Sequence, residues 1–140
     1  MNSSKTVAAE LGLRLVVPEH DGVPLTASLH YRADDPYAIR MAFHVGMDEP
    51  VEWIFARDLL AEGLTEPAGE GDVRVWPAAT GNHRVLNISL SSPFGQAHFE
   101  APVKDVADFL RKTYQIVVAG EESDHVNVEA ELTALLRQAS

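Results

Sequence analysis

The sequence predicts an α+β fold: mainly antiparallel β-sheet, with one inserted helix and two helices at the C-terminal end. Apolar and polar residues alternate through most of the first two-thirds of the chain, as they do in strands with one buried face. One stretch inside that region, residues 51–64, repeats its apolar residues at helical spacing, and the last third of the chain does the same. Because no linker, repeat or low-complexity segment interrupts the 140 residues, we expect residues 1–140 to form one domain.

Six strands are expected to follow one another between tight turns. The pairs Asp21-Gly22 and Gly81-Asn82 tolerate positive φ, as hairpin turns require. The fourth strand is expected to end at Pro77, which has no backbone N–H to donate. The apolar faces of the six strands are, in order, Leu11, Leu13, Leu15 and Val17; Leu25, Ala27, Leu29 and Tyr31; Tyr37, Ile39, Met41, Phe43 and Val45; Val73 and Val75; Leu86, Ile88 and Leu90; and Ala97 and Phe99.

Three helices are expected, the first over residues 54–62. Pro102 stands where a proline suits the first position of the second helix, and Asn127 can cap the third. The apolar stripes of the three helices are Trp53, Ala56, Leu60 and Leu64; Val103, Val106, Ala107 and Leu110; and Val128, Leu132, Leu135 and Leu136.

The first helix carries charged residues that invite a catalytic interpretation. Arg57, Asp58 and Glu62 stand away from its apolar stripe. A catalytic carboxylate pair needs a cleft that raises the pKa of one member, and nothing in the sequence indicates such a cleft. We therefore interpret the three residues as the exposed, partner-facing side of an amphipathic helix. A small enzyme that uses Asp58 or Glu62, together with His98, is the less favoured alternative.

Composition narrows the function classes. The formal net charge of −10 repels phosphate backbones, so nucleic acid is not an expected partner. The chain has no cysteine, which excludes disulfides and thiolate metal sites and fits a reducing compartment. We find no signal peptide and no apolar run of the ~20 residues that a membrane span needs. We therefore expect a cytoplasmic protein that reaches a membrane only through a partner.

No motif for catalysis or for a cofactor is found. The six histidines show none of the short spacings of zinc sites, and the sequence has no GxSxG elbow for a serine nucleophile. The glycines at 69 and 71 are accompanied by acids, whereas a phosphate-binding loop needs a lysine. We expect no catalytic residue, no metal and no cofactor, so a binding function is favoured over an enzyme.

Two further places are candidates for a protein-interaction surface. One is the acidic segment that follows the second helix, which contains Gly120, Glu121, Glu122 and Asp124. The other consists of apolar residues that fall on the polar side of their strands, where exposed apolar patches often become interfaces; Trp76 and Val85 are the candidates.

Four segments resemble one known family. DPYAIRMAFH (35–44), VEWIFARDLLAEGL (51–64), GDVRVWP (71–77) and LSSPFGQAHFEAP (90–102) look like the SsgA-like proteins of sporulating actinobacteria. The combination of FARDLL with GDVxVWP is specific, and the likeness extends over nearly the whole chain.

The resemblance implies a non-enzymatic factor in sporulation-specific cell division. Proteins of this kind, together with an SsgA-type paralogue, mark future septum sites and bring the tubulin-like protein FtsZ there, so the expected location is the cytoplasm at the septum. The resemblance also implies a fold like that of the Whirly and mitochondrial RNA-binding proteins, and a homo-oligomer of three chains. A single-stranded nucleic-acid binding module is the alternative that this fold suggests. The nucleic-acid binding proteins that have this fold use basic surfaces, however, whereas this chain is acidic.

Overall fold

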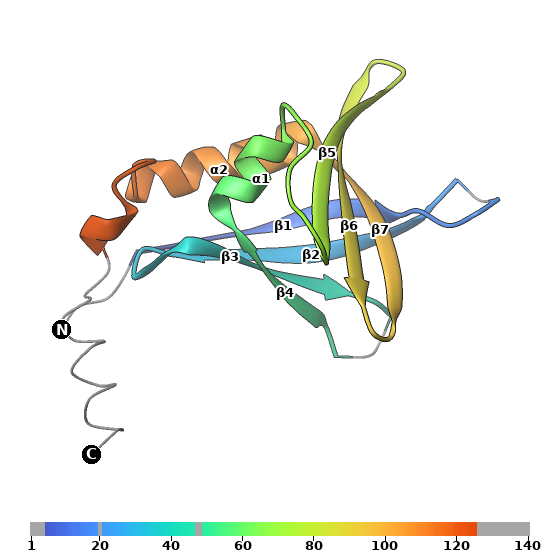
Figure 1. Cartoon of the computed structure of the whole chain (residues 1–140), viewed down its shortest axis with the longest axis horizontal. Coiled ribbons are helices and arrows are strands. Elements are labelled where there is room, and N and C mark those ends of the chain that lie inside the picture. The colour runs from blue at the N-terminus through green and yellow to red at the C-terminus, as the bar shows by residue number, and fades with distance from the viewer. Residues whose placement is uncertain (1–4, 20, 47–48, 126–140) are drawn as a thin grey trace.

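Seven strands form one antiparallel sheet in the computed structural model, which describes residues 5–19, 21–46 and 49–125 (Figure 1). The order across the sheet is β4-β3-β2-β1-β7-β6-β5. Within these residues two α-helices accompany the sheet, so the predicted α+β class with a mainly antiparallel sheet is confirmed. The strands are β1 (Thr6–Leu15), β2 (Val23–Arg32), β3 (Asp35–His44), β4 (Val51–Ala56), β5 (Val73–Thr80), β6 (His83–Ser92) and β7 (Gly95–Pro102).

The predicted apolar faces of the strands form most of the core. Leu29 lies between Ala9 and Met41 in the ladder, and Ile88 lies between Val75 and Phe99, so each row is continuous across neighbouring strands. The residues of these faces that are buried are Leu11, Leu13, Ala27, Leu29, Tyr31, Ile39, Met41, Phe43, Val75, Leu86, Ile88, Leu90 and Phe99. Tyr37 and Val45 are exposed instead. Val45 follows the end of β3, and Tyr37 lies near the shift in register between β2 and β3.

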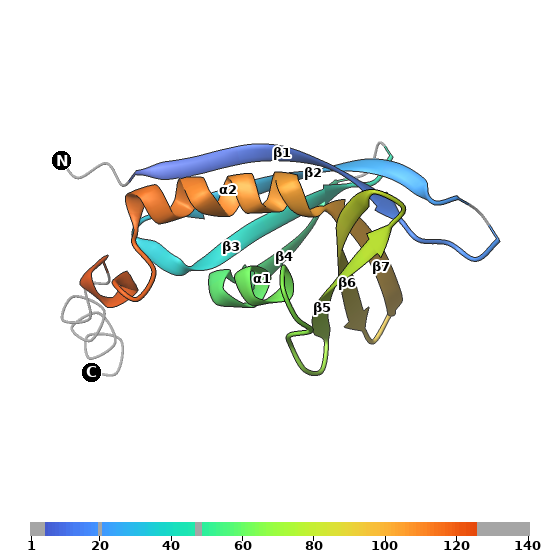
Figure 2. The ribbon, with the colours of Figure 1, turned by 90° about the horizontal axis from the view of Figure 1, so that it is seen from above.

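The sheet is curled, and both helices lie on its concave side (Figure 2). β1 and β7 pair over a short stretch, at Arg14–Glu100 and Leu15–Phe99, and Val16 N–H adds a bond to the His98 carbonyl. On the other side of Arg14–Glu100 the two halves of the sheet diverge. The helix α2 (Val103–Ile116) runs along β1 and buries Val106, Phe109, Leu110 and Thr113. The shorter helix α1 (Arg57–Gly63) lies beside it and buries Leu60.

Residues 51–56 form a strand, which corrects the predicted helix over 54–62. In β4, Phe55 lies opposite Ile39 and Val51 lies opposite Phe43. The apolar residues of this stretch fit both periods, because Val51, Trp53 and Phe55 also alternate. Pairing with β3 satisfies those backbone groups of residues 51–56 that face β3, and this pairing favours the strand over the helix. Only Arg57–Gly63 remains helical.

Two prolines differ slightly from their predicted roles. β5 continues past Pro77 to Thr80, whereas the strand was expected to end there. β5 is an edge strand, where a missing N–H costs no ladder bond on the solvent side. Pro102 is the N-cap of α2, one residue before the helical position that was expected.

After α2, residues 118–125 turn back toward β3; we call them the strap. The strap ends in a 3-10 turn, η1 (Glu122–His125). The predicted third helix, with its cap at Asn127, lies outside the described residues.

Candidate functional site

Arg57 is buried, which corrects its predicted place on an exposed helix face. Only 1% of its side chain is exposed. Its Nη1 donates to the carbonyl oxygens of Val117 at 2.8 Å and Thr113 at 3.3 Å, both at the C-terminal end of α2. The negative end of a helix dipole stabilises a cation, so Arg57 suits this position. The Thr113 carbonyl also accepts from the backbone N–H of Val117 at 3.0 Å, and Arg57 is its second donor. Arg57 therefore joins the beginning of α1 to the end of α2.

Glu122 is also buried, although the acidic segment around it was predicted to be an exposed surface. Its Oε1 accepts a hydrogen bond from Nη2 of Arg57 at 3.1 Å and another from the backbone N–H of Gly120 at 2.6 Å. The two candidates that the sequence assigned to separate surfaces are therefore bonded to each other. A buried carboxylate needs such partners, because an unpaired charge in the interior is costly.

Two tyrosine rings enclose the Arg57 guanidinium. The guanidinium carbon lies 5.0 Å from the ring centroid of Tyr31 and 4.5 Å from that of Tyr114, within the range of cation–π attraction. Burial raises the pKa of Tyr31 to about 12, although the positive charge of Arg57 acts in the opposite direction. Burial also raises the pKa of Tyr114. Both phenols are consequently neutral over the physiological range.

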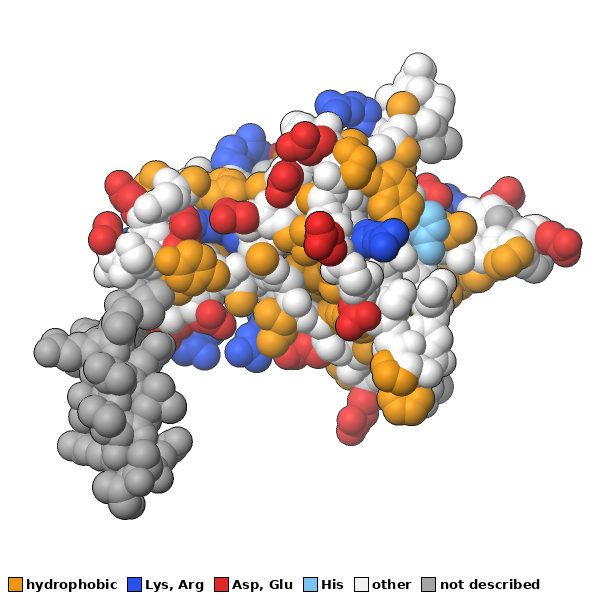
Figure 3. Space-filling model, viewed as in Figure 1, with side chains coloured by type: hydrophobic (Ala, Val, Ile, Leu, Met, Phe, Trp, Pro, Cys, Tyr) orange, Lys and Arg blue, Asp and Glu red, His pale blue; other side chains and the backbone are white. Residues whose placement is uncertain are grey.

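The remaining charged candidates are exposed. Asp58 and Glu62 lie on the outer side of α1, and Glu121 and Asp124 lie on the strap. Gly120 is exposed as well, with a positive φ of 87° in the turn of the strap. Because the Arg57–Glu122 pair ties the strap to α1, these two groups of acids belong to one face of the molecule. Figure 3 shows acidic side chains on this face over both α1 and the strap.

Trp76 and Val85 lie on the convex side of the sheet and are half-buried. The Trp76 ring is tilted against that of His98, with 5.2 Å between the ring centroids. His98 in turn shares a hydrogen bond of 2.7 Å with Asn87 Oδ1, and Asn87 is buried. Trp53 is half-buried and packs against the core.

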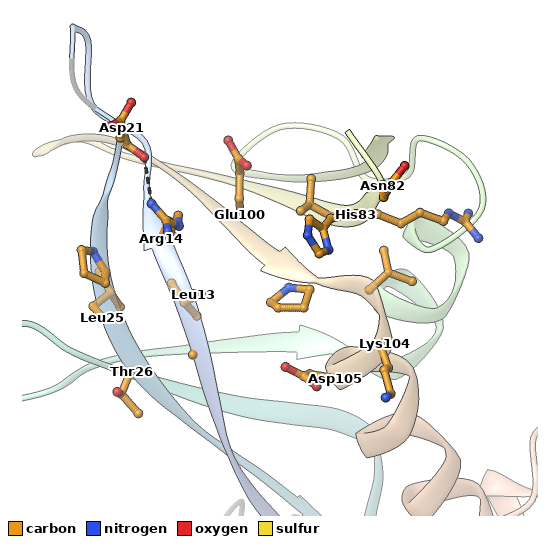
Figure 4. Close-up of a pocket in the computed structure, with 16 residues that line it drawn as sticks. Leu13, Arg14, Asp21, Leu25, Thr26, Asn82, His83, Glu100, Lys104 and Asp105 are labelled. Atoms are coloured by element: carbon orange, nitrogen blue, oxygen red, sulfur yellow. Dashed lines mark hydrogen bonds between the residues drawn. The ribbon is translucent and has the colours of Figure 1, made fainter. Parts of the chain in front are cut away.

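Val85 contributes to a groove of about 1200 Å³ where β1 and β7 diverge (Figure 4). Pro102 and Val103 add apolar surface to it, and Arg14 and Lys104 are among the charged residues that line it. The groove opens on the side of the sheet that Val85 faces. The sequence singled out Val85 as an apolar residue on a polar strand face, but the groove itself depends on how the two halves of the sheet separate.

The residues of the enzyme alternative do not come together. His98 lies on the convex side of the sheet, next to Trp76. Asp58 and Glu62 lie on α1, which covers the concave side, where Gly63 packs against Val75. In the described part of the chain, no group of three His, Asp or Glu side chains is placed to hold a metal ion. Within the same residues, no helix is long and apolar enough to cross a membrane.

The position of Arg57 in its helix is a signal that the sequence reasoning did not use. Arg57 is the first residue of α1, and the positive end of a helix dipole disfavours a cation unless the cation has partners elsewhere. That signal was missed because the helix was expected to begin earlier, at residue 54.

Comparisons with known proteins agree with the family resemblance. The family model described as "Streptomyces sporulation and cell division protein, SsgA" matches residues 25–122. The sporulation-specific cell division protein SsgB of Thermobifida fusca is 57% identical over 133 residues, which cover 94% of this chain and 96% of that protein.

Two solved structures share the fold and much of the sequence. One is an SsgA-like sporulation-specific cell division protein from Thermobifida fusca, with a TM-score of 0.86 and 54% identity, covering 96% of this chain and 98% of that one. The other belongs to work relating mutations in SsgB to longitudinal cell division during sporulation of Streptomyces coelicolor. It has a TM-score of 0.86 and 49% identity, covering 89% of this chain and 98% of that one. The chain therefore belongs to the SsgA family of sporulation and cell division proteins.

Proposed function

We propose that this chain is a non-enzymatic adaptor that helps to localise and recruit FtsZ to septum sites during sporulation-specific cell division. The observation that carries the proposal is the 57% identity, over 94% of the chain, to a protein named for sporulation-specific cell division. The proposed location is the cytoplasm at the septum, with any membrane reached through a partner.

The proposed contact surface is the face that carries α1 and the strap. Asp58, Glu62, Glu121 and Asp124 are exposed there and support recognition of a partner with complementary charge. Arg57 and Glu122 support this surface from inside, because their contact holds the strap beside α1. Trp76 and Val85, on the other side of the sheet, are proposed for a second contact, which leaves separate surfaces for FtsZ and for an SsgA-type paralogue.

Self-association is proposed as part of the same function, with a homotrimer as the expected form. β4 is at one edge of the sheet and exposes Val51 and Ile54, each with about half of its surface accessible. An unpaired edge with apolar side chains favours pairing with another chain. At the opposite edge, Pro77 interrupts the row of donors and Ala68 already bonds to Val75, so this edge is better protected.

A nucleic-acid binding module of Whirly-like fold remains the competing hypothesis. It requires a basic surface that follows the phosphate backbone, whereas the chain carries a net charge of −10. It predicts retention of single-stranded DNA or RNA that weakens as salt is added. A flat titration at low salt is the result that we expect.

Co-sedimentation with FtsZ filaments tests the adaptor proposal. Purified protein is expected in the pellet with polymerised FtsZ, and in the supernatant when FtsZ is kept unassembled. The assay is repeated with an SsgA-type paralogue added, because recruitment through that partner gives a pellet only in the mixture. Absence from the pellet in both cases would count against direct recruitment.

A further inference from the structure

The strap lies against β3, but among the described residues one side-chain pair, Arg57 with Glu122, joins it to the rest of the domain by a hydrogen bond. Val117, just before it, is completely buried, but from Val118 onward Glu122 is the one buried residue of the described strap. Val118 is 54% exposed. Within the strap, Glu121 N–H donates to the carbonyl of Val118 and Asp124 N–H donates to that of Glu121. These bonds shape the strap but do not hold it to the sheet.

Glu122 therefore provides the main polar attachment. Its Oε1 accepts from Arg57 on α1 and from the backbone of Gly120 in the strap itself. A hydrogen bond between charged groups in a buried place is stronger than one between neutral groups. Among the described residues, this is the polar contact that must break for the strap to leave the domain.

Arg57 has further contacts that do not involve the strap. Its Nη1 bonds to Thr113 and Val117, which belong to the end of α2 and not to the strap. The rings of Tyr31 and Tyr114 remain on either side of the guanidinium. The Nε of Arg57 is buried and has no acceptor among the described residues. If the strap opens, water can bond to the guanidinium, and this compensates part of the lost bond to Glu122.

We propose that the Arg57–Glu122 contact is a latch: the strap opens as a local unit when this contact breaks, while the sheet and both helices stay folded. The opening exposes the guanidinium of Arg57, which lies between two tyrosine rings. It also moves Glu121 and Asp124 away from the face that carries α1. Local openings of this kind occur where few apolar contacts hold a segment. The latch does not depend on the proposed role in cell division.

Hydrogen exchange of backbone amides tests the latch in the full chain. The variant Glu122→Ala removes the carboxylate, and Glu121→Ala, at the exposed neighbouring position, is the matched control. We expect Glu122→Ala to accelerate exchange at the amides of Glu121 and Asp124 by roughly tenfold or more, the scale set by loss of a hydrogen bond to a charged group. Amides of α2 and of the central strands are expected to change much less, and Glu121→Ala is expected to leave the strap amides nearly unchanged.

Two outcomes would overturn the latch. One is unchanged exchange in the strap of Glu122→Ala, which would mean that the carboxylate does not hold it. The other is equal acceleration of the strap and the core, which would mean that the strap opens only when the whole domain unfolds. The variant Glu122→Gln keeps an oxygen that accepts hydrogen bonds and lacks the charge, so an intermediate rate is expected for it, which checks that the ion pair contributes to the latch.

Discussion

Arg57 at the beginning of α1 and Glu122 in the strap form a buried ion pair, with 3.1 Å between Nη2 and Oε1. The two residues are 65 positions apart in the sequence. Their contact joins the beginning of α1 to the strap, and Arg57 also bonds to the end of α2, on the side of the sheet where both helices lie (Figure 1). The exposed acids next to each partner, Asp58 and Glu121, are consequently carried on one face.

Replacing Arg57 is expected to destabilise the domain strongly. Arg57→Met removes the donor to the end of α2 and leaves the carboxylate of Glu122 without its cation. We expect the free energy of unfolding in urea to fall by about 3 kcal/mol. Arg111→Ala is the control, because Arg111 pairs with Asp108 on the exposed surface, and such pairs contribute less than about 1 kcal/mol. Equal losses in the two variants would contradict the importance of the buried contacts.

The close packing of α1 on β5 predicts a penalty for a single added methyl group. A Cβ placed on Gly63 would lie 2.9 Å from Cβ of Val75 and even closer to one of its methyl groups. Overpacking of this kind costs about 1–3 kcal/mol, so Gly63→Ala should lower the midpoint of thermal unfolding. Gly12→Ala is the matched control, since a Cβ at Gly12 meets nothing within 4 Å. A Gly63→Ala domain as stable as the Gly12→Ala domain would show that α1 is not packed this tightly.

The raised pKa of Tyr31 predicts a loss of stability in alkaline solution. Burial raises this pKa from 10.0 to about 12 in the folded protein. Between these values the unfolded chain releases the phenolic proton and the folded chain keeps it. The stabilising contribution of Tyr31 is therefore complete below about pH 10 and decreases as the pH rises toward about 12, by up to about 3 kcal/mol.

Tyr31→Phe isolates this effect. The variant loses the hydrogen bond from the phenol to the carbonyl of Pro36, so it is expected to be less stable by about 1 kcal/mol at neutral pH. It has no proton to release, so its unfolding free energy should fall less steeply between about pH 10 and pH 12 than that of the parent. Identical slopes in urea titrations at several pH values would exclude the predicted role of Tyr31.

Charge reversal on α1 tests the proposed contact surface. The double change Asp58→Lys and Glu62→Lys alters exposed residues only, so the free energy of unfolding is expected to change by less than about 1 kcal/mol. Co-sedimentation with FtsZ filaments is expected to weaken severalfold, because the face would then present the opposite charge. Glu10→Lys, at an exposed position on β1, is the control. Equal binding by all variants would place the contact elsewhere.

Much of the sheet was predictable from the sequence because its buried face repeats with period two. Leu29 and Ile88 each belong to an alternating run, and such runs are specific where one face is buried. The stretch 51–64 was harder, since its apolar residues satisfy both the strand and the helix period. Only pairing with β3, which depends on residues 35–44, makes its first half a strand.

The site was less predictable, because the roles of Arg57 and Glu122 depend on contacts between distant segments. In the sequence, Glu122 belongs to an acidic turn that looks solvated, and Arg57 stands off the apolar stripe of a helix. Their burial follows from the end of α2 lying beside the beginning of α1, where Thr113 and Val117 offer carbonyl oxygens. The apolar periodicity of each segment does not indicate that the end of α2 lies beside the beginning of α1. Asp58 and Glu62, which the same reasoning put on the exposed side of the helix, are exposed, because no described segment covers them.

The central claim, that this chain is an oligomeric adaptor for FtsZ, is tested most directly by solution mass. Light scattering is measured on the purified protein alone and then on its mixture with FtsZ. We predict a mass near three times the 15.3 kDa of one chain for the protein alone, and a heavier species containing both proteins in the mixture. Unchanged masses of the two components in the mixture, with and without an SsgA-type paralogue, would contradict the claim.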